Sequence, residues 1–383
     1  MARLHLFDTG FGPALRVGVA VAWLGALAAC RGDSGVVRIG IAGPFAEPRG
    51  HSMLVAAQLA VKEINDGGGV QGRPLELVVQ DDSANTTRAM VVAQTLRDNP
   101  TVVAVIGHLT SGTTLAASDI YNAGRNPVVA ISPSASNPDL SGIGPFTFRV
   151  CATDLAHGGT LARFVFERLG LPAVAVLYLN DDYGRGILAT FAEEFQRLGG
   201  TIVEEDPLLA STDPGAYLDR IQRDGRARAL MVAGDRTTGV AVLRAARARG
   251  LTIPLVGGDG LTGIQDEGAI ADDIYISSNY LPDRPGERNA AFLRAYAEAS
   301  GGERPDHRGA GAYDAVYLLA NAIRAGGTRR AAIRDLLSQV GRARPVYDGV
   351  TGRIAFDDNG DVPEKTVFVG VVRGGRIQLA GDR

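Results

Sequence analysis

Short apolar runs alternate with amphipathic stretches along most of the chain, and this alternation constrains the fold more than any other feature. The first runs span residues 36–42, 75–80 and 102–107, and helical patterns at 53–65 and 87–96 lie between them. An apolar run that ends at Gly or Ser and precedes a helix is typical of a parallel strand buried on both faces. Strands that alternate with helices predict parallel sheets with helices on both faces. We therefore expect an α/β fold.

The length of 383 residues is too great for one ordinary domain. The alternation resumes at 173–179 and continues to 255–256, while extended segments at 146–150 and 274–278 are suitable for crossings between two sheets. We predict two doubly wound parallel-sheet lobes joined by three hinge crossings, with a cleft between them. Lobe 1 is predicted to comprise residues 36–150 and 281–357, and lobe 2 residues 151–280 and 358–383.

Composition excludes several classes of protein. The formal net charge is −3 and no basic face stands out, which argues against nucleic acid as a partner. The histidines show no metal-ligand spacing, so we predict no metal site and interpret His51 and His108 as solvated loop residues. The pattern G-x-G-x-x-G at 258–263 lacks the helix that a dinucleotide site needs, so we predict no cofactor. The five histidines are His5, His51, His108, His157 and His307.

The N-terminal segment has the pattern of a secretory signal. Arg3 and Arg16 precede an apolar stretch at 17–29, which is too short for a comfortable membrane span and ends in small residues before Cys30. The sequence Leu-Ala-Ala-Cys resembles the bacterial lipobox, so we predict a signal peptide at 1–29 and lipidation of Cys30. A generic signal peptide with a chance cysteine is the alternative. If Cys30 carries lipid, Cys151 has no disulfide partner, and we expect it to be a small buried residue, with a reactive thiol as the alternative.

Two serine-bearing loops follow neighbouring apolar runs. Residues 110–113 follow the run at 102–107, and residues 132–136 follow the run at 128–131. The carboxyl ends of neighbouring strands are where open α/β sheets bind ligands. Because Ser111 begins a helix, its hydroxyl and the unpaired backbone N–H groups behind it can hold a carboxylate or another small anion. The loops therefore predict a recognition site. Ser111 is not surrounded by the G-x-S-x-G pattern of a serine nucleophile, and we predict that the protein is not an enzyme.

Segments in the same order along the chain resemble the periplasmic leucine/isoleucine/valine-binding protein family, the type I solute-binding proteins of ABC importers. The resemblance implies two lobes that close over an amino acid and deliver it to a membrane permease. The matching segments are Ala-Val-Lys-Glu-Ile-Asn at 60–65, Asp-Asp at 81–82, Ser-Asp-Ile-Tyr at 118–121, Phe148-Arg149 with Asp154, Asp-Tyr-Gly at 182–184, Tyr-Asp-Ala-Val at 313–316, and Phe356-Asp357 with Gly360-Asp361.

The same resemblance assigns ligand contacts by position. It places the loop residues Ser111, Ser134, Ala135 and Ser136 where members of the family bind the α-carboxylate and amino group. It also implies that Tyr183 covers the ligand and that Asp259 holds the α-ammonium group. A zwitterion needs donors for its carboxylate and an anion for its ammonium, so these residue types suit an amino acid.

Two positions depart from the branched-chain pattern, because Arg49 and Asp235 stand where aromatic residues are expected. Charged side chains remove packing surface from an apolar pocket, so the ligand could be polar, acidic or not an amino acid. Arg49 could pair with a second carboxylate of the ligand, or it could point to solvent at the rim of the cleft.

The resulting hypothesis is a monomeric, lipid-anchored binding protein of the periplasm or cell envelope, which delivers an amino acid or a related small polar metabolite to ABC permease subunits. The alternative is a ligand sensor of the same fold that signals to a separate partner. An exported hydrolase that uses Ser111 is a third, remote possibility.

Overall fold

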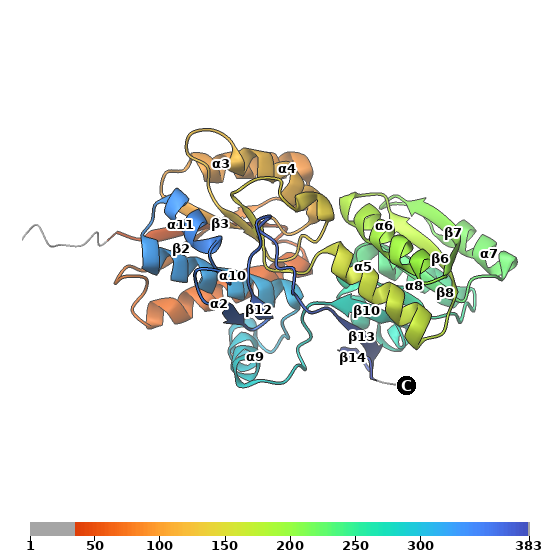
Figure 1. Cartoon of the computed structure of the whole chain (residues 1–383). Helices are drawn as coiled ribbons and strands as arrows, with labels where there is room; N and C mark the ends of the chain where they lie inside the picture. The colour runs from red at the N-terminus through yellow and green to blue at the C-terminus, as the bar shows by residue number, and fades with distance from the viewer. Residues whose placement is uncertain (1–34, 382–383) are drawn as a thin grey trace, which may run out of the picture.

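The computed structural model describes residues 35–381, which form two α/β lobes that lie side by side (Figure 1). The first lobe contains a five-stranded parallel sheet in the order β2-β1-β3-β4-β5. Helices cover both faces of this sheet. The strands are β1 (Val37–Gly43), β2 (Leu75–Asp81), β3 (Val102–Ile106), β4 (Ala130–Ser132) and β5 (Thr147–Arg149). The helices are α2 (Pro48–Asp66), α3 (Thr86–Asp98), α4 (Ser111–Asn122), α9 (Glu287–Ser300), α10 (His307–Gly326) and α11 (Arg330–Leu337).

The second lobe contains a seven-stranded sheet in the order β14-β13-β10-β9-β8-β6-β7. Its five strands from β7 to β10 are parallel, and a terminal antiparallel hairpin, β13 with β14, extends the sheet beside β10. The strands are β6 (Ala173–Leu179), β7 (Thr201–Leu208), β8 (Ala229–Ala233), β9 (Leu255–Gly257), β10 (Tyr275–Ser278), β13 (Phe368–Arg373) and β14 (Arg376–Leu379). The helices are α5 (Asp154–Arg163), α6 (Asp182–Arg197), α7 (Gly215–Asp224) and α8 (Arg236–Ala248), with short 3₁₀ segments at Asp259–Leu261 and Ile264–Ala271.

The chain passes between the two sheets three times. It crosses after β5, returns after β10, and crosses again between the small hairpin β11 (Tyr347–Gly349) with β12 (Gly352–Ile354) and strand β13. The predicted fold class, two parallel-sheet lobes of the α/β type, is confirmed. Among residues 35–381, no helix is long and apolar enough to cross a membrane.

The cores explain why the apolar runs become central strands. All five residues of β3 and all five of β8 are buried, as expected for parallel strands that are covered on both faces. In the first lobe, helix α10 packs along α2, with Met53 and Ala57 of α2 and Ala315 of α10 in one buried cluster.

Helix starts are the main point at which the structure differs from the sequence prediction. Helices α6, α8 and α10 begin several residues before their first apolar positions, because Asp181, Asp235 and Asp306 cap them through side-chain oxygens. The sequence does not predict helix α5, because the glycine at position 158 disfavours a helix. In the structure, the missing side chain of Gly158 allows close packing. A β-carbon at Gly158 would collide with Thr190 of helix α6.

Candidate ligand-binding site

A cavity of about 60 Å³ lies where the two lobes meet, at the carboxyl ends of parallel strands from both sheets. This is the edge at which open α/β sheets bind ligands. The cavity brings together six of the residues that the sequence predicted for the site, although they come from loops far apart in the chain. These six are Arg49, Ser111, Ser134, Tyr183, Asp235 and Asp259.

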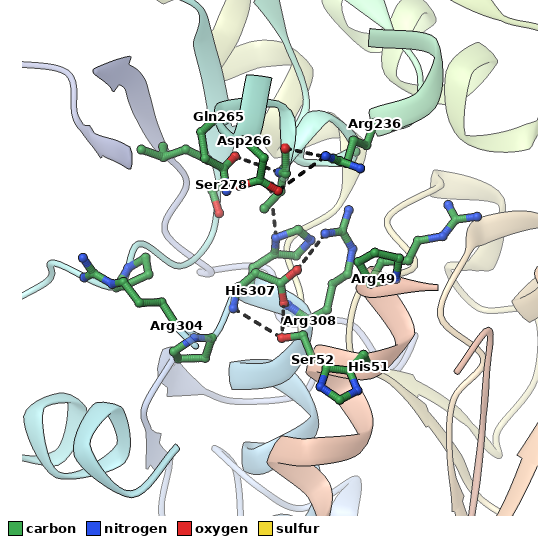
Figure 2. A pocket seen from close by; sticks show the side chains of 18 of the residues that line it. Arg49, His51, Ser52, Arg236, Gln265, Asp266, Ser278, Arg304, His307 and Arg308 are labelled. Carbon is green, nitrogen blue, oxygen red and sulfur yellow. Dashed lines mark hydrogen bonds and ion pairs between the residues drawn. The ribbon is translucent and has the colours of Figure 1, made fainter. Parts of the chain in front are cut away.

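A larger groove of about 760 Å³ shares part of its wall with this cavity (Figure 2). Arg49, Asp235, Gly260 and Arg308 line both spaces, so they form the boundary between them. In Figure 2, His307 and Arg308 extend from the start of helix α10 toward Arg236, at the start of α8, and Asp266, in the 3₁₀ segment Ile264–Ala271.

The first lobe supplies hydroxyl groups and a helix start. Ser111 is the first residue of α4 and is buried, and its Oγ accepts a hydrogen bond from the backbone N–H of Asn137 at 3.3 Å. Thr110 caps the helix with its side-chain oxygen. The first backbone N–H groups of a helix lack partners within it and favour negative charge. This corner of the cavity is therefore suited to a carboxylate.

In the second serine loop, Ser134 lines the cavity, whereas Ala135 and Ser136 do not. Ser134 Oγ lies 3.3 Å from Nε2 of His307. The N–H of Ala135 donates to Ser132 Oγ at 3.0 Å, and its carbonyl accepts from Arg149 at 3.4 Å. Ser136 is fully buried, and its hydroxyl has no hydrogen-bond partner within the described part of the chain. Neither Ala135 nor Ser136 lines the cavity, so their predicted ligand contacts have no counterpart in this geometry.

Asp259 supplies the negative group on the side of the second lobe. It follows β9 and is buried, and its Oδ1 accepts a hydrogen bond from the Tyr183 hydroxyl at 3.1 Å. The Tyr183 oxygen in turn accepts from the N–H of Gly260 at 2.9 Å. A β-carbon at Gly258 or Gly260 would collide with Tyr183, so these glycines make room for the tyrosine. This packing accounts for the glycines on both sides of Asp259.

Two histidines and an arginine that the sequence did not predict for the site surround Asp259. Nε2 of His307 lies 3.4 Å and Nε2 of His157 lies 3.6 Å from Asp259 Oδ2, and Arg308 donates to the backbone carbonyl of Asp259 at 3.3 Å. His157 also contacts Ser277 Oγ through Nδ1 at 2.9 Å. One feature of the sequence could have indicated His307 and Arg308: they follow Asp306, a residue type that often caps a helix, and so lie in the first turn of α10. Ser111 follows Thr110 in the same way at the start of α4.

One carboxylate oxygen of this cluster, Asp259 Oδ2, lies near both imidazoles but makes no hydrogen bond within the described residues. Burial acts to raise the pKa of Asp259, but His157, His307, Arg308 and the Tyr183 hydroxyl outweigh it, so the net direction is downward. Burial lowers the pKa of His307 to about 4 and also lowers that of His157, so both imidazoles are neutral near pH 7. Within the described residues, Asp259 Oδ2 has no hydrogen-bond partner. A buried carboxylate oxygen of this kind needs a cationic or donor group.

Arg49 and Asp235 face each other across the boundary between the cavity and the groove. Arg49 Nε donates to Glu47 Oε2 at 2.6 Å, and its Nη1 lies 3.8 Å from Asp235 Oδ2. The other oxygen of Asp235 accepts from the N–H of Thr238 at 2.9 Å and caps helix α8. Arg49 is therefore directed across the cleft and not into solvent, with a side chain that is 24% exposed.

The interpretation of His108 as a solvated residue is wrong. Its side chain is fully buried, with Nδ1 2.6 Å from Asp82 Oδ2 and Nε2 3.1 Å from the Tyr121 hydroxyl. The loop after β3 turns inward under α4, where these two polar partners replace water. His51 is half exposed, as predicted. Cys151 is free and buried, which confirms its expected role.

The predictions for the N-terminal segment concern residues that the structure does not describe. The signal peptide at 1–29 and the lipidation site at Cys30 lie outside the described residues. Among residues 35–381, no group of three or more His, Cys, Asp or Glu side chains is arranged so that it could hold a metal ion.

Comparison with known proteins now identifies the fold and its family. A family model described as periplasmic binding protein matches residues 37–376. The chain belongs to the periplasmic binding protein family. Membership implies an extracytoplasmic location, and the resemblance to the leucine/isoleucine/valine-binding proteins is confirmed.

Three relatives illustrate the similarity. A leucine-, isoleucine-, valine-, threonine- and alanine-binding protein of Pseudomonas aeruginosa is 29% identical over 339 residues, covering 85% of this chain and 87% of that protein. An ABC transporter substrate-binding protein of Desulfitobacterium hafniense, solved with leucine, is 30% identical with a TM-score of 0.78, covering 90% of this chain and 100% of that one. A branched-chain amino acid transporter substrate-binding protein of Streptococcus pneumoniae, solved with isoleucine, is 29% identical with a TM-score of 0.79, covering 90% and 98%.

Proposed function

We propose that this protein is the substrate-binding component of an ABC importer and that it binds an amino acid between its two lobes. The carboxylate of the ligand would lie against Ser111, Ser134 and the first turn of α4. Its ammonium group would bind Oδ2 of Asp259. The observation that carries this proposal is that Asp259, with one oxygen lacking a partner, lines the same small cavity as the two serines from the opposite lobe.

The strength of such contacts is sufficient for function. A hydrogen bond to a charged group contributes about 1.5–3 kcal/mol. Three or four of them, together with apolar contacts, reach about −8 kcal/mol, which corresponds to micromolar affinity. Family membership supports the proposal, since one relative described above is an amino acid-binding protein by name and the other two are transporter substrate-binding proteins solved with leucine or isoleucine.

The ligand would favour the closed arrangement because it contacts both lobes at once. Contacts between the lobes already exist near the cavity, among them the side-chain amide of Asn137, which donates to the carbonyl of Asp182 at 2.5 Å. A ligand that bonds to Ser111 on one side and Asp259 on the other binds the closed form better than the open form. It therefore shifts the population toward closure.

The partners in this proposal are ABC permease subunits, and the protein would act as a monomer anchored to the membrane through lipid on Cys30. The basic and apolar pattern of residues 1–29 supports export, and Leu-Ala-Ala-Cys supports lipidation. If Cys30→Ala leaves the protein in the membrane fraction of its native host, the anchor is assigned wrongly. A sensor that signals to a separate chain is the second candidate. The adjacent genes separate the two, since permease and ATPase genes would support an importer and a histidine kinase gene would support a sensor.

Calorimetry with matched analogues tests the binding mode. Each of the twenty amino acids is titrated first, and the tightest binder is compared with its methyl ester and its deaminated analogue. We expect micromolar binding of the amino acid and at least 100-fold weaker binding of both analogues, because each analogue lacks one of the two charged groups. Equal affinity for the ester or for the deaminated compound would overturn the proposed contacts.

A further inference from the structure

The boundary between the small cavity and the groove controls which ligand side chains fit. One water needs about 10–15 Å³ of such space, so a cavity of about 60 Å³ holds only a few non-hydrogen atoms. The ammonium group, α-carbon and carboxylate of an amino acid would fill it. The side chain of the ligand must then extend toward the groove and meet Arg49 and Asp235 at the boundary.

Arg49 and Asp235 each present an unused hydrogen-bonding position at this boundary. Nη1 of Arg49 and Oδ2 of Asp235 are 3.8 Å apart, which is too long for a hydrogen bond. Arg49 is held from the other side by Glu47, and Asp235 is held by its capping bond to Thr238. The pair is therefore fixed in place with one donor and one acceptor available side by side.

This arrangement disfavours both apolar and charged side chains. A branched apolar side chain would remove water from the guanidinium and the carboxylate without replacing the lost hydrogen bonds. A carboxylate would be attracted by Arg49 and repelled by Asp235. An ammonium group would be attracted by Asp235 and repelled by Arg49. Asp181, which also lines the cavity, adds a further acceptor on the side of Asp235.

We propose that the site selects amino acids whose side chain ends in a carboxamide, and that Arg49 and Asp235 recognise this group by hydrogen bonds. The amide oxygen would accept from Arg49 Nη1, and the amide nitrogen would donate to Asp235 Oδ2. A neutral group that both donates and accepts fits a guanidinium beside a carboxylate, since neither charge is then opposed. This inference rests on the proposed amino acid-binding function and names the class of its substrate.

The test compares glutamine and asparagine with glutamate, aspartate, leucine and valine by calorimetry. For the wild-type protein we expect at least tenfold tighter binding of one of the two carboxamides than of any of the other four. The double variant Arg49→Leu/Asp235→Ser removes both charges and keeps a capping side chain at 235. We expect it to bind the carboxamide at least tenfold more weakly and leucine more tightly than the wild type does.

Two further variants keep the result interpretable. Arg304→Leu removes a guanidinium that lines the groove but not the cavity and pairs with Asp283, so the preference should not change. The single variant Asp235→Asn keeps the cap and should reduce the preference if the double variant does not fold.

The possible failures are distinguishable. If leucine or valine binds the wild type more tightly than either carboxamide, or if both Arg49→Leu/Asp235→Ser and Asp235→Asn keep the wild-type preference, the carboxamide inference is wrong while amino acid binding stands. If none of the twenty amino acids binds, the proposed function itself fails.

Discussion

The hydroxyl of Tyr183 donates a hydrogen bond to Asp259 Oδ1 at 3.1 Å, although the two residues lie 76 positions apart in the chain. The same hydroxyl accepts from the N–H of Gly260, so the tyrosine holds the loop that carries the carboxylate as well as the carboxylate itself. Tyr183 therefore fixes one oxygen of Asp259, and the ligand contact that we propose falls on the other.

Replacing Tyr183 by Phe should weaken ligand binding without unfolding the protein. Because this hydrogen bond is present with and without ligand, its loss acts on affinity through the orientation of Asp259, and affinity should fall about tenfold. Titration calorimetry with the preferred amino acid measures the loss. Tyr178→Phe is the matched control, since Tyr178 belongs to β6 and does not line the cavity. Equal affinities of the two variants would show that Tyr183 has no positioning role.

Asp154 should make the protein less stable as the pH rises. Its carboxylate is fully buried, and neither oxygen has a hydrogen-bond partner among residues 35–381. Burial, assisted by the negative charges of Asp259 and Asp181, raises its pKa from 3.8 to about 8, although the nearby Ser136 hydroxyl and the positive charge of Arg149 oppose this shift. Between these two values the folded state binds more protons than the unfolded state, so stability is complete below about pH 4 and is lost as the pH rises through about 8.

The variant Asp154→Asn tests this dependence, because it removes the ionisation and keeps the shape. Melting temperatures from pH 5 to pH 9 should fall less steeply for the variant than for the wild type, and the variant should be the more stable protein at pH 9. Asp219→Asn, at an exposed position paired with Arg249, is the control. A wild-type slope that persists in Asp154→Asn would assign the effect to another group.

Much of this arrangement could be predicted from the sequence, and the rest depends on contacts between distant segments. The run at 173–179 becomes β6 with the predicted bounds, because seven apolar residues are too few for an ordinary helix and fit a strand buried on both faces. Ser111 and Asp259 follow parallel strands of different sheets, and they line one cavity because the carboxyl ends of the two sheets face each other across the cleft. The approach of His157 and His307 to Asp259 has no local pattern, since it depends on how α5 and α10 of different lobes meet the same loop.

His307 should destabilise the protein in acid. Its folded-state pKa of about 4 lies below the usual 6.5, mainly because of burial, so between these values the unfolded state binds more protons. Stability is therefore complete above about pH 6.5 and is lost as the pH falls toward 4, by about 3 kcal/mol at most. The free energy of unfolding, measured with urea, should differ less between pH 7 and pH 5 for His307→Gln than for the wild type. His51→Gln, at a half-exposed position, should behave as the wild type does.

Arg149 should be essential for stability, because it joins the hinge strand β5 to the second serine loop. It donates to Asp361 Oδ1 at 2.6 Å, to the carbonyl of Asn137 at 2.8 Å and to Ser141 Oγ at 2.6 Å, and it is buried. Arg149→Met leaves the Asp361 carboxylate buried and unpaired, which should cost about 3–5 kcal/mol in the free energy of unfolding.

Urea denaturation measures this loss for Arg149→Met. Arg163→Met breaks an exposed pair with Glu194 and should change stability by no more than about 1 kcal/mol. The double variant Arg149→Met/Asp361→Asn should recover part of the loss, since it removes the unpaired charge. A loss below about 1 kcal/mol for Arg149→Met would contradict the assigned role.

The most direct test of amino acid binding between the lobes is calorimetry on Asp259→Asn with whichever of the twenty amino acids binds the wild type most tightly. The substitution keeps the size of the side chain and removes the charge proposed to hold the ammonium group. We predict at least a 100-fold loss of affinity, while Asp266→Asn, which alters a carboxylate of the groove outside the small cavity, binds as the wild type does. Undiminished affinity of Asp259→Asn in a folded protein would contradict the account.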